Sequence, residues 1–226
     1  MSTLLLRLAS PLQSWGSDSK FEVRQTGREP TKSGVIGMIS SALGRKRNEP
    51  VEDLSCLKFG IRADREGTII KDFHIARPQD KKTPYVTTRY YLSDAVFTVG
   101  FESEDTDFLK ELEYALKHPV YPLFLGRRSC PPTLPVVLGI REKSLADALK
   151  TEPFFDKRHE KGRVRIVLDD AENRNIETRI KDVPISFSQE LRQFGYRTTT
   201  EDFITVCDEI TDENKTEHDA FKELED

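Results

Sequence analysis

Apolar positions along the first 142 residues follow two periods, and together they predict six elements. Alternating or continuous apolar residues are typical of β-strands, and they occupy residues 3–10, 57–64, 95–101 and 136–140. Apolar residues at helical spacing predict helices over 33–43 and 106–117. The order β, α, β, β, α, β is that of the ferredoxin-like, or split βαβ, fold. We therefore predict the α+β class, with a ferredoxin-like domain over residues 1–142.

Two further strand-like segments interrupt this order between the second and third strands. They span 68–75 and 85–92, and they flank the polar, proline-bounded, basic stretch RPQDKKTP. This arrangement predicts a protruding hairpin inserted at about residues 65–94.

The pattern after residue 142 consists of shorter segments. A Ser-x-x-Asp capping pattern predicts a small helix over 144–150. Strand-like segments follow at 163–168, 176–180, 183–187 and 203–206. We expect the first two of these strands to form a hairpin, and residues 143–207 to form a small β-rich C-terminal unit. The strongly acidic stretch 208–226 is expected to be a disordered or loosely helical tail.

The distribution of charge matters more than its total. The chain of 226 residues has a net charge of −4, but residues 208–226 hold nine acidic residues and two lysines. The rest of the chain therefore carries +3, and residues 20–47 alone hold seven basic and two acidic residues. A locally basic face suits a polyanion, although a solvated charged surface would have the same composition.

The loop before the first helix is the main candidate for anion binding. Arg24, Arg28 and Lys32 lead into Ser33, which we expect to be the N-cap, and Gly44 falls where the helix should end. A helix start offers unpaired N–H groups and a positive dipole end to an anion. A phosphate fits this combination, and an ordinary capped helix with a solvated loop is the alternative.

A nucleotide site is disfavoured, because this loop lacks the glycines of a phosphate-binding loop. Counted back from its Lys-Ser pair, the two glycine positions of a Walker motif hold Thr26 and Thr31. No GxGxxG follows a predicted strand. The expected anion is therefore a nucleic-acid backbone or another phosphate.

Two more segments have the composition of nucleic-acid contacts. Arg127 and Arg128 lie in a proline-braced turn before the fourth strand, which neighbours the first strand in the predicted topology. The two basic loops should therefore lie close together. On the hairpin, Arg89, Tyr90 and Tyr91 combine a cation with aromatic rings, as in single-strand binding sites. Trp15 is either a core residue or a ring on which a base stacks.

The sequence gives no sign of a metal site, a cofactor site or a membrane span. There is no HExxH, no Cys/His cluster and no CxxC among Cys56, Cys130 and Cys207, so we expect neither a metal nor a cofactor. The unpaired cysteines fit a reducing cytoplasm. The chain has no apolar run long enough to span a membrane, and its N-terminal apolar stretch is too short for a signal peptide.

Five blocks of the chain together resemble one known family. They are LRLASPLQSWG (6–16), TGREPTKSGVIGMISSALG (26–44), RYYLSDAVFTV (89–99), LGRRSCPP (125–132) and VPISF with RQFGYR (183–197). In this order they are similar to the CasD family of type I-E CRISPR Cascade subunits, within the repeat-associated RNA-binding superfamily. The resemblance implies an RRM-related ferredoxin-like domain with a thumb-like hairpin. It further implies that the protein holds the 5′ handle of the CRISPR RNA at one end of the complex, beside CasC and CasA, with target DNA reached through the complex.

We therefore predict a non-catalytic RNA-binding subunit with no catalytic residues. Its predicted RNA contacts are Arg24, Gln25, Thr26, Arg28, Lys32, Ser33, Arg89, Tyr90, Arg127, Arg128 and Ser129. One alternative is a metal-independent endoribonuclease that processes precursor RNA, with His74 as the candidate base and Lys71 or Tyr90 as helper. The other is a purely structural assembly subunit. The resemblance implies that a separate subunit cuts the RNA in type I-E systems.

Overall fold

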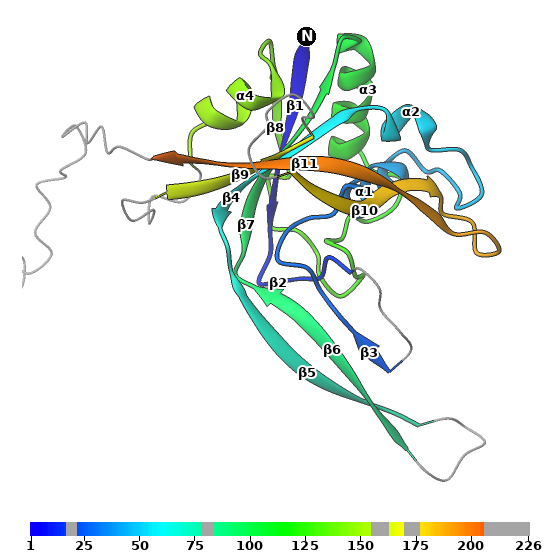
Figure 1. The fold of residues 1–226 in the computed structure, drawn as a ribbon. Helices are drawn as coiled ribbons and strands as arrows, with labels where there is room; N and C mark the ends of the chain where they lie inside the picture. The colour runs from blue at the N-terminus through cyan, green and yellow to red at the C-terminus, as the bar shows by residue number, and fades with distance from the viewer. Residues whose placement is uncertain (17–21, 78–83, 155–162, 170–176, 206–226) are drawn as a thin grey trace, which may run out of the picture.

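The computed structural model describes residues 1–16, 22–77, 84–154, 163–169 and 177–205, and the description below refers to these residues (Figure 1). They form a seven-stranded sheet in the order β10-β11-β9-β4-β7-β1-β8 and a smaller sheet in the order β2-β6-β3, with β5 paired to β6. The strands of the main sheet are β1 (Ser2–Ala9), β4 (Lys58–Arg65), β7 (Val96–Ser103), β8 (Val137–Arg141), β9 (Arg163–Leu168), β10 (Glu177–Ser186) and β11 (Gln193–Thr205). Those of the smaller sheet are β2 (Leu12–Gln13), β3 (Val23–Arg24), β5 (Thr68–Ala76) and β6 (Tyr85–Ser93).

The six elements expected from the pattern are present. The helices are α1 (Lys32–Ala42) and α3 (Thr106–Lys117), with the single turn α2 (Glu52–Ser55) between them in sequence. Strands β4, β7, β1 and β8 lie side by side, and each neighbouring pair is antiparallel. The chain is thus a mixed α and β protein with mostly antiparallel sheets.

The main sheet is covered on both faces, which explains the unbroken apolar run of β1. Leu4, Leu6 and Leu8 are fully buried in the core that includes side chains of α1 and α3. Leu5 points to the opposite face and packs in a second cluster with Leu145 and other residues of α4 (Leu145–Thr151). A strand that is buried on both faces is apolar at successive positions, so its sequence does not alternate between apolar and polar residues.

The predicted hairpin is confirmed. Strands β5 and β6 pair antiparallel in unbroken register from Thr68↔Ser93 to Ala76↔Tyr85, and they project away from the main sheet (Figure 1). The loop expected at its tip includes residues 78–83, which lie outside the described part of the chain.

The prediction for the C-terminal strands is wrong in its pairing. Segment 176–180 does not pair back on 163–168, because β11 lies between β9 and β10 and is antiparallel to both. Through β9, which pairs with β4, these strands extend the main sheet and form no sheet of their own. The segments expected at 176–180 and 183–187 are one bulged strand, β10. The acidic stretch 208–226 lies outside the described residues.

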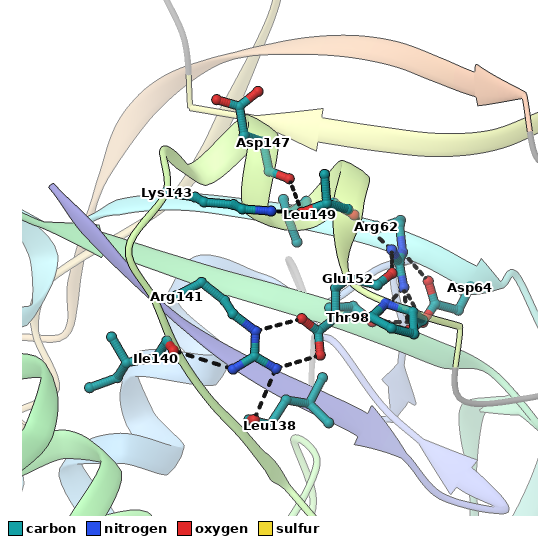
Figure 2. A network of polar contacts seen from close by, with 12 residues as sticks. Arg62, Asp64, Thr98, Leu138, Ile140, Arg141, Lys143, Asp147, Leu149 and Glu152 are labelled. Atoms are coloured by element: carbon teal, nitrogen blue, oxygen red, sulfur yellow. Dashed lines mark hydrogen bonds and ion pairs between the residues drawn. The ribbon is translucent and has the colours of Figure 1, made fainter.

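A buried polar network fixes α4 to the sheet (Figure 2). Arg62 is fully buried, and its Nε donates to Asp64 at 2.5 Å while its Nη1 donates to the carbonyl of Leu149 at 2.7 Å. Arg141 forms a bidentate ion pair with Glu152, at 2.9 and 2.8 Å. The carbonyl of Leu149 in the last turn of α4 thus finds a donor on β4, and the Glu152 side chain just after the helix is tied to β8. No helix in the described ranges has the length and apolar character needed to cross a membrane.

Candidate nucleic-acid interface

Three segments that are distant in sequence meet beside β6. Strand β3 pairs parallel to β6, which places Arg24 opposite Arg89. The turn at 125–130 is held against the segment after β2, because the Ser14 N–H donates to the Leu125 carbonyl at 3.1 Å. Arg127 completes the contact by donating from Nη2 to the backbone oxygen of Arg24 at 3.1 Å. The expected convergence of the two basic loops is confirmed.

Gly126 permits the close approach of the turn. Its φ is +83°, and a Cβ built on it would lie 1.7 Å from the backbone oxygen of Ser14. No residue with a side chain could occupy this position without displacing one of the two segments.

Trp15 has the core role that was one of its two predicted alternatives. Its side chain is 1% exposed, and its Nε1 donates to Gln13 Oε1 at 2.9 Å. Gln13 in turn donates to the carbonyl of Ala95 at 2.8 Å. The indole supports the loop that carries the basic residues, and it is not available for stacking on a base.

Tyr91 lies at the centre of the cationic cluster, although Tyr90 was the tyrosine predicted to contact RNA. Alternation along β6 puts Arg89 and Tyr91 on one face and Tyr90 on the other. The guanidinium carbon of Arg127 lies 4.6 Å from the centroid of the Tyr91 ring. Burial raises the pKa of the Tyr91 hydroxyl, but hydrogen bonding to Arg127, Ser129 and Arg89 lowers that pKa below its ordinary value. The hydroxyl therefore lies in a strongly positive environment.

The two arginines beside Tyr91 have more donors than the protein satisfies. Arg127 Nη1 and Arg89 Nε are buried and have no hydrogen-bond partner among the residues that the structure describes. Unpaired buried N–H groups are costly, and those of a guanidinium are well matched to phosphate oxygens. The cluster of Arg24, Arg89, Tyr91, Arg127 and Ser129, hereafter the arginine–tyrosine cluster, is thus suited to an anionic ligand.

Lys32 does not contribute to this cluster, contrary to expectation. It is 5% exposed, and its ammonium lies 3.0 Å from Asp169 Oδ2 and 2.7 Å from the carbonyl of Leu57. Its backbone N–H donates to Asp182, which also accepts from Arg197. Lys32 therefore joins α1 to β9, β10 and β11, and its charge is neutralised inside the protein.

Ser33 is not the N-cap of α1, because the N-cap lies two residues earlier than predicted. Thr31 is the N-cap, and its Oγ1 accepts from Gly34 N at 3.2 Å. The hydroxyl of Ser33 lies 3.5 Å from that of Thr31 inside the first turn. The predicted end is confirmed, since Gly44 follows the C-cap Leu43 with φ +78°.

The remaining predicted contacts differ in whether their side chains are hydrogen-bonded within the protein or exposed. The hydroxyl of Thr26 is engaged, because it accepts from Trp15 N at 2.9 Å and donates to the carbonyl of Gly27 at 3.0 Å. Three of the others are exposed, namely Gln25, Arg28 and Arg128.

Arg28 lines a cavity of about 480 Å³ beside the start of α1. The other cation there, Arg165, donates to Glu66 at 2.8 Å and to Glu29 at 2.5 Å. Hydrogen bonding to Glu66 raises the pKa of Arg165 despite its burial. Because Arg165 is neutralised by these carboxylates, Arg28 is the cation of this cavity that can meet a ligand.

His74, the candidate base of the nuclease alternative, lies farther along the hairpin. Its Nε2 is 2.5 Å from Asp72 Oδ2, and Asp72 is opposite Arg89 in the ladder. In the described ranges, no group of three or more His, Cys, Asp or Glu residues is placed to hold a metal ion.

Comparison with known proteins identifies the family. A family model described as CRISPR-associated protein (Cas_Cas5) matches residues 3–200. The chain belongs to this family. It is 36% identical over 163 residues to the CRISPR system Cascade subunit CasD of Escherichia coli (strain K12), which covers 63% of this chain and 73% of that protein. The resemblance found in the sequence is thereby confirmed.

Two solved structures of similar proteins agree with the Cas_Cas5 fold. A chain of a CRISPR RNA-guided surveillance complex matches with a TM-score of 0.73 and 32% identity, covering 90% of both chains. A protein described as a Cas protein matches with a TM-score of 0.70 and 38% identity, covering 90% of this chain and 95% of that one.

Proposed function

We propose that this chain is a non-catalytic subunit of a Cascade-type CRISPR surveillance complex, in which it holds the 5′ handle of the guide RNA and caps one end of the assembly. The observation that carries the proposal is the arginine–tyrosine cluster, where buried guanidinium donors have no partner within the described part of the chain. The similarity to CasD of E. coli and to a chain of an RNA-guided surveillance complex supports it. CasC and CasA are the proposed neighbours, and the cytoplasm, where the guide RNA is assembled, is the proposed location.

The order of strands in the main sheet supports this role. We propose that β4-β7-β1-β8, with α1 and α3 on one face, is a ferredoxin-like core of the RRM-related type. The β5–β6 hairpin is then the thumb inserted into it. The arginine–tyrosine cluster lies at the base of the thumb, where it can clamp a splayed nucleotide of a single-stranded handle.

The salt dependence of RNA binding tests the proposal. In the variant Arg89→Gln/Arg127→Gln, two phosphate contacts are lost while polar side chains remain. Each contact contributes about 0.7 to the slope of log K against log salt for a single strand, so the slope should flatten by about 1.4. When salt is raised from 50 to 200 mM, the affinity of the double variant should therefore fall by a factor about sevenfold smaller than the factor for the wild type.

Lys110→Gln is the matched control, because Lys110 is exposed on α3 and paired only with Asp107 in the described structure. Fluorescence anisotropy with labelled handle RNA measures both slopes, and thermal unfolding verifies that each variant is folded. Equal affinity and slope for the double variant and the wild type would refute the proposed interface.

The Asp72–His74 pair supports one competing function. A histidine oriented by a carboxylate is the arrangement of a general base, and here it lies on the same face of the hairpin as Arg89. The nuclease alternative predicts that the purified chain cuts repeat RNA without metal and that His74→Ala abolishes the cut. Our proposal predicts intact RNA in both cases, with binding retained.

A further inference from the structure

One face of the β10–β11 ribbon packs against the rest of the protein, and the opposite face is exposed. On the inner face, Asp182 accepts from the first N–H of α1, and the carbonyl of Pro184 accepts from Ser55 Oγ at 2.7 Å. The outer face is exposed, with Tyr196 at 56%. In Figure 1 this ribbon and the β5–β6 hairpin leave the main sheet in different directions.

Cations lie over aromatic rings on this outer face. The guanidinium carbon of Arg179 is 4.7 Å from the centroid of the Tyr196 ring, and Lys181 Nζ is 5.7 Å from it. At the end of the ribbon, the guanidinium carbon of Arg192 is 5.1 Å from the centroid of the Phe194 ring. These contacts place aromatic rings, guanidinium groups and positive charge next to one another at the surface.

The charge of the patch favours an anionic partner. Between residues 178 and 198 the acidic residues are Asp182 and Glu190, and the basic ones are Arg179, Lys181, Arg192 and Arg197. Asp182 and Arg197 neutralise each other on the inner side, where both are buried. The exposed charges left on the ribbon and its turn are the cations Arg179, Lys181 and Arg192 and the carboxylate Glu190.

We propose that the outer face of the β10–β11 ribbon is a second binding surface for single-stranded nucleic acid. Phosphates would meet Arg179, Lys181 and Arg192, while a base stacks on Tyr196 or on the guanidinium that lies over it. Stacking on aromatic rings within a basic groove is the general mode of sequence-independent single-strand binding. This surface extends the proposed function, because it is separate from the arginine–tyrosine cluster.

An acidic protein partner would use the same cations and would also pack against the Tyr196 ring, since tyrosine is enriched in protein interfaces. Oligonucleotide binding by the purified chain is therefore what distinguishes the two partners. A nucleic-acid surface requires both the charges and Tyr196, and it must accept oligonucleotides that lack the handle sequence.

The test uses the full chain carrying Arg89→Gln/Arg127→Gln, so that the proposed handle interface is weakened in every sample. Labelled twelve-residue oligo(U) and oligo(dT) are titrated by fluorescence anisotropy, and the two probes separate RNA from DNA as the natural ligand. Arg179→Gln/Lys181→Gln should flatten the salt slope by about 1.4, and Tyr196→Ser should weaken binding at least fivefold. Arg163→Gln is the matched control, since Arg163 lies over the exposed ring of Phe203 at the other end of β11.

Unchanged oligonucleotide binding in the ribbon variants, relative to Arg163→Gln, would overturn the inference. So would variants that bind oligonucleotides normally but fail to join a complex with protein partners, because that result assigns the patch to an acidic protein. Failure of the handle interface is a separate outcome, since it is measured with handle RNA on a chain whose ribbon is intact.

Discussion

Replacement of Gly126 by alanine tests whether the turn at 125–130 is held as the structure shows. The left-handed φ of +83° at this position costs an alanine about 1–2 kcal/mol. The new Cβ would also lie 1.7 Å from the backbone oxygen of Ser14, where contacts below 3.0 Å essentially never occur. The turn must therefore retreat by about 1.3 Å.

A movement of this size breaks the hydrogen bond from Ser14 N to the carbonyl of Leu125, which is 3.1 Å long. Its loss adds about 1 kcal/mol, so Gly126→Ala should lower the free energy of unfolding by about 2–3 kcal/mol. Arg127, the next residue, moves with the turn away from Tyr91 and Arg24. Handle binding should therefore weaken, although the altered residue itself makes no contact with RNA.

Urea unfolding and handle binding are measured on the same samples. With a urea m-value near the upper end of the usual range, the midpoint should fall by about 1 M. Gly37→Ala is the control, because its Cβ would meet Phe187 at an ordinary 3.7 Å and alanine favours helix α1 by about 1 kcal/mol. It should raise the midpoint and leave binding unchanged. Wild-type stability and affinity in Gly126→Ala would refute the described packing of the turn.

Three further predictions concern buried charges. Arg62→Met leaves Asp64 buried without its cation and should cost about 3–5 kcal/mol in urea unfolding; a cost below 1 kcal/mol would contradict the network in Figure 2. Lys32→Met should destabilise by about 3 kcal/mol yet leave the salt slope of RNA binding unchanged, whereas a flattened slope would restore it as a phosphate contact. The Tyr91 hydroxyl should titrate below its ordinary pKa of 10 and move upward in Arg127→Gln, as followed by NMR of labelled tyrosine. Because a lowered pKa stabilises only the ionised form, this contribution exists above pH 10 and vanishes as pH falls through the folded-state pKa.

Much of the fold was predictable, because the apolar residues of its core helices and strands recur at regular spacings. The apolar run of β1 and the alternation of β4 and β7 come from side chains that pack on the sheet. Most of strand β11, residues 193–202, was missed for the opposite reason. Its buried residues include Arg197, Thr199 and Thr200, which are polar, so this part of the strand has no hydrophobic alternation.

The site was predictable as a region but not residue by residue. Arg24, Arg89 and Arg127 were selected and do come together, because the order of strands brings their loops to one edge. The assignment of Lys32 was wrong, since its partner Asp169 is more than a hundred residues away in sequence. Tyr91 was passed over for Tyr90, although alternation along a strand places residue 91 on the same face as residue 89.

The most direct test of the central claim is a crosslinking map of the guide RNA in the assembled complex. The handle should carry photoactivatable uridines, and crosslinked peptides should be identified by mass spectrometry. The account predicts that the handle crosslinks to residues 22–28, to 89–91 and to 125–130. Crosslinks of the handle confined to other surfaces of this chain, or to other subunits alone, would contradict it.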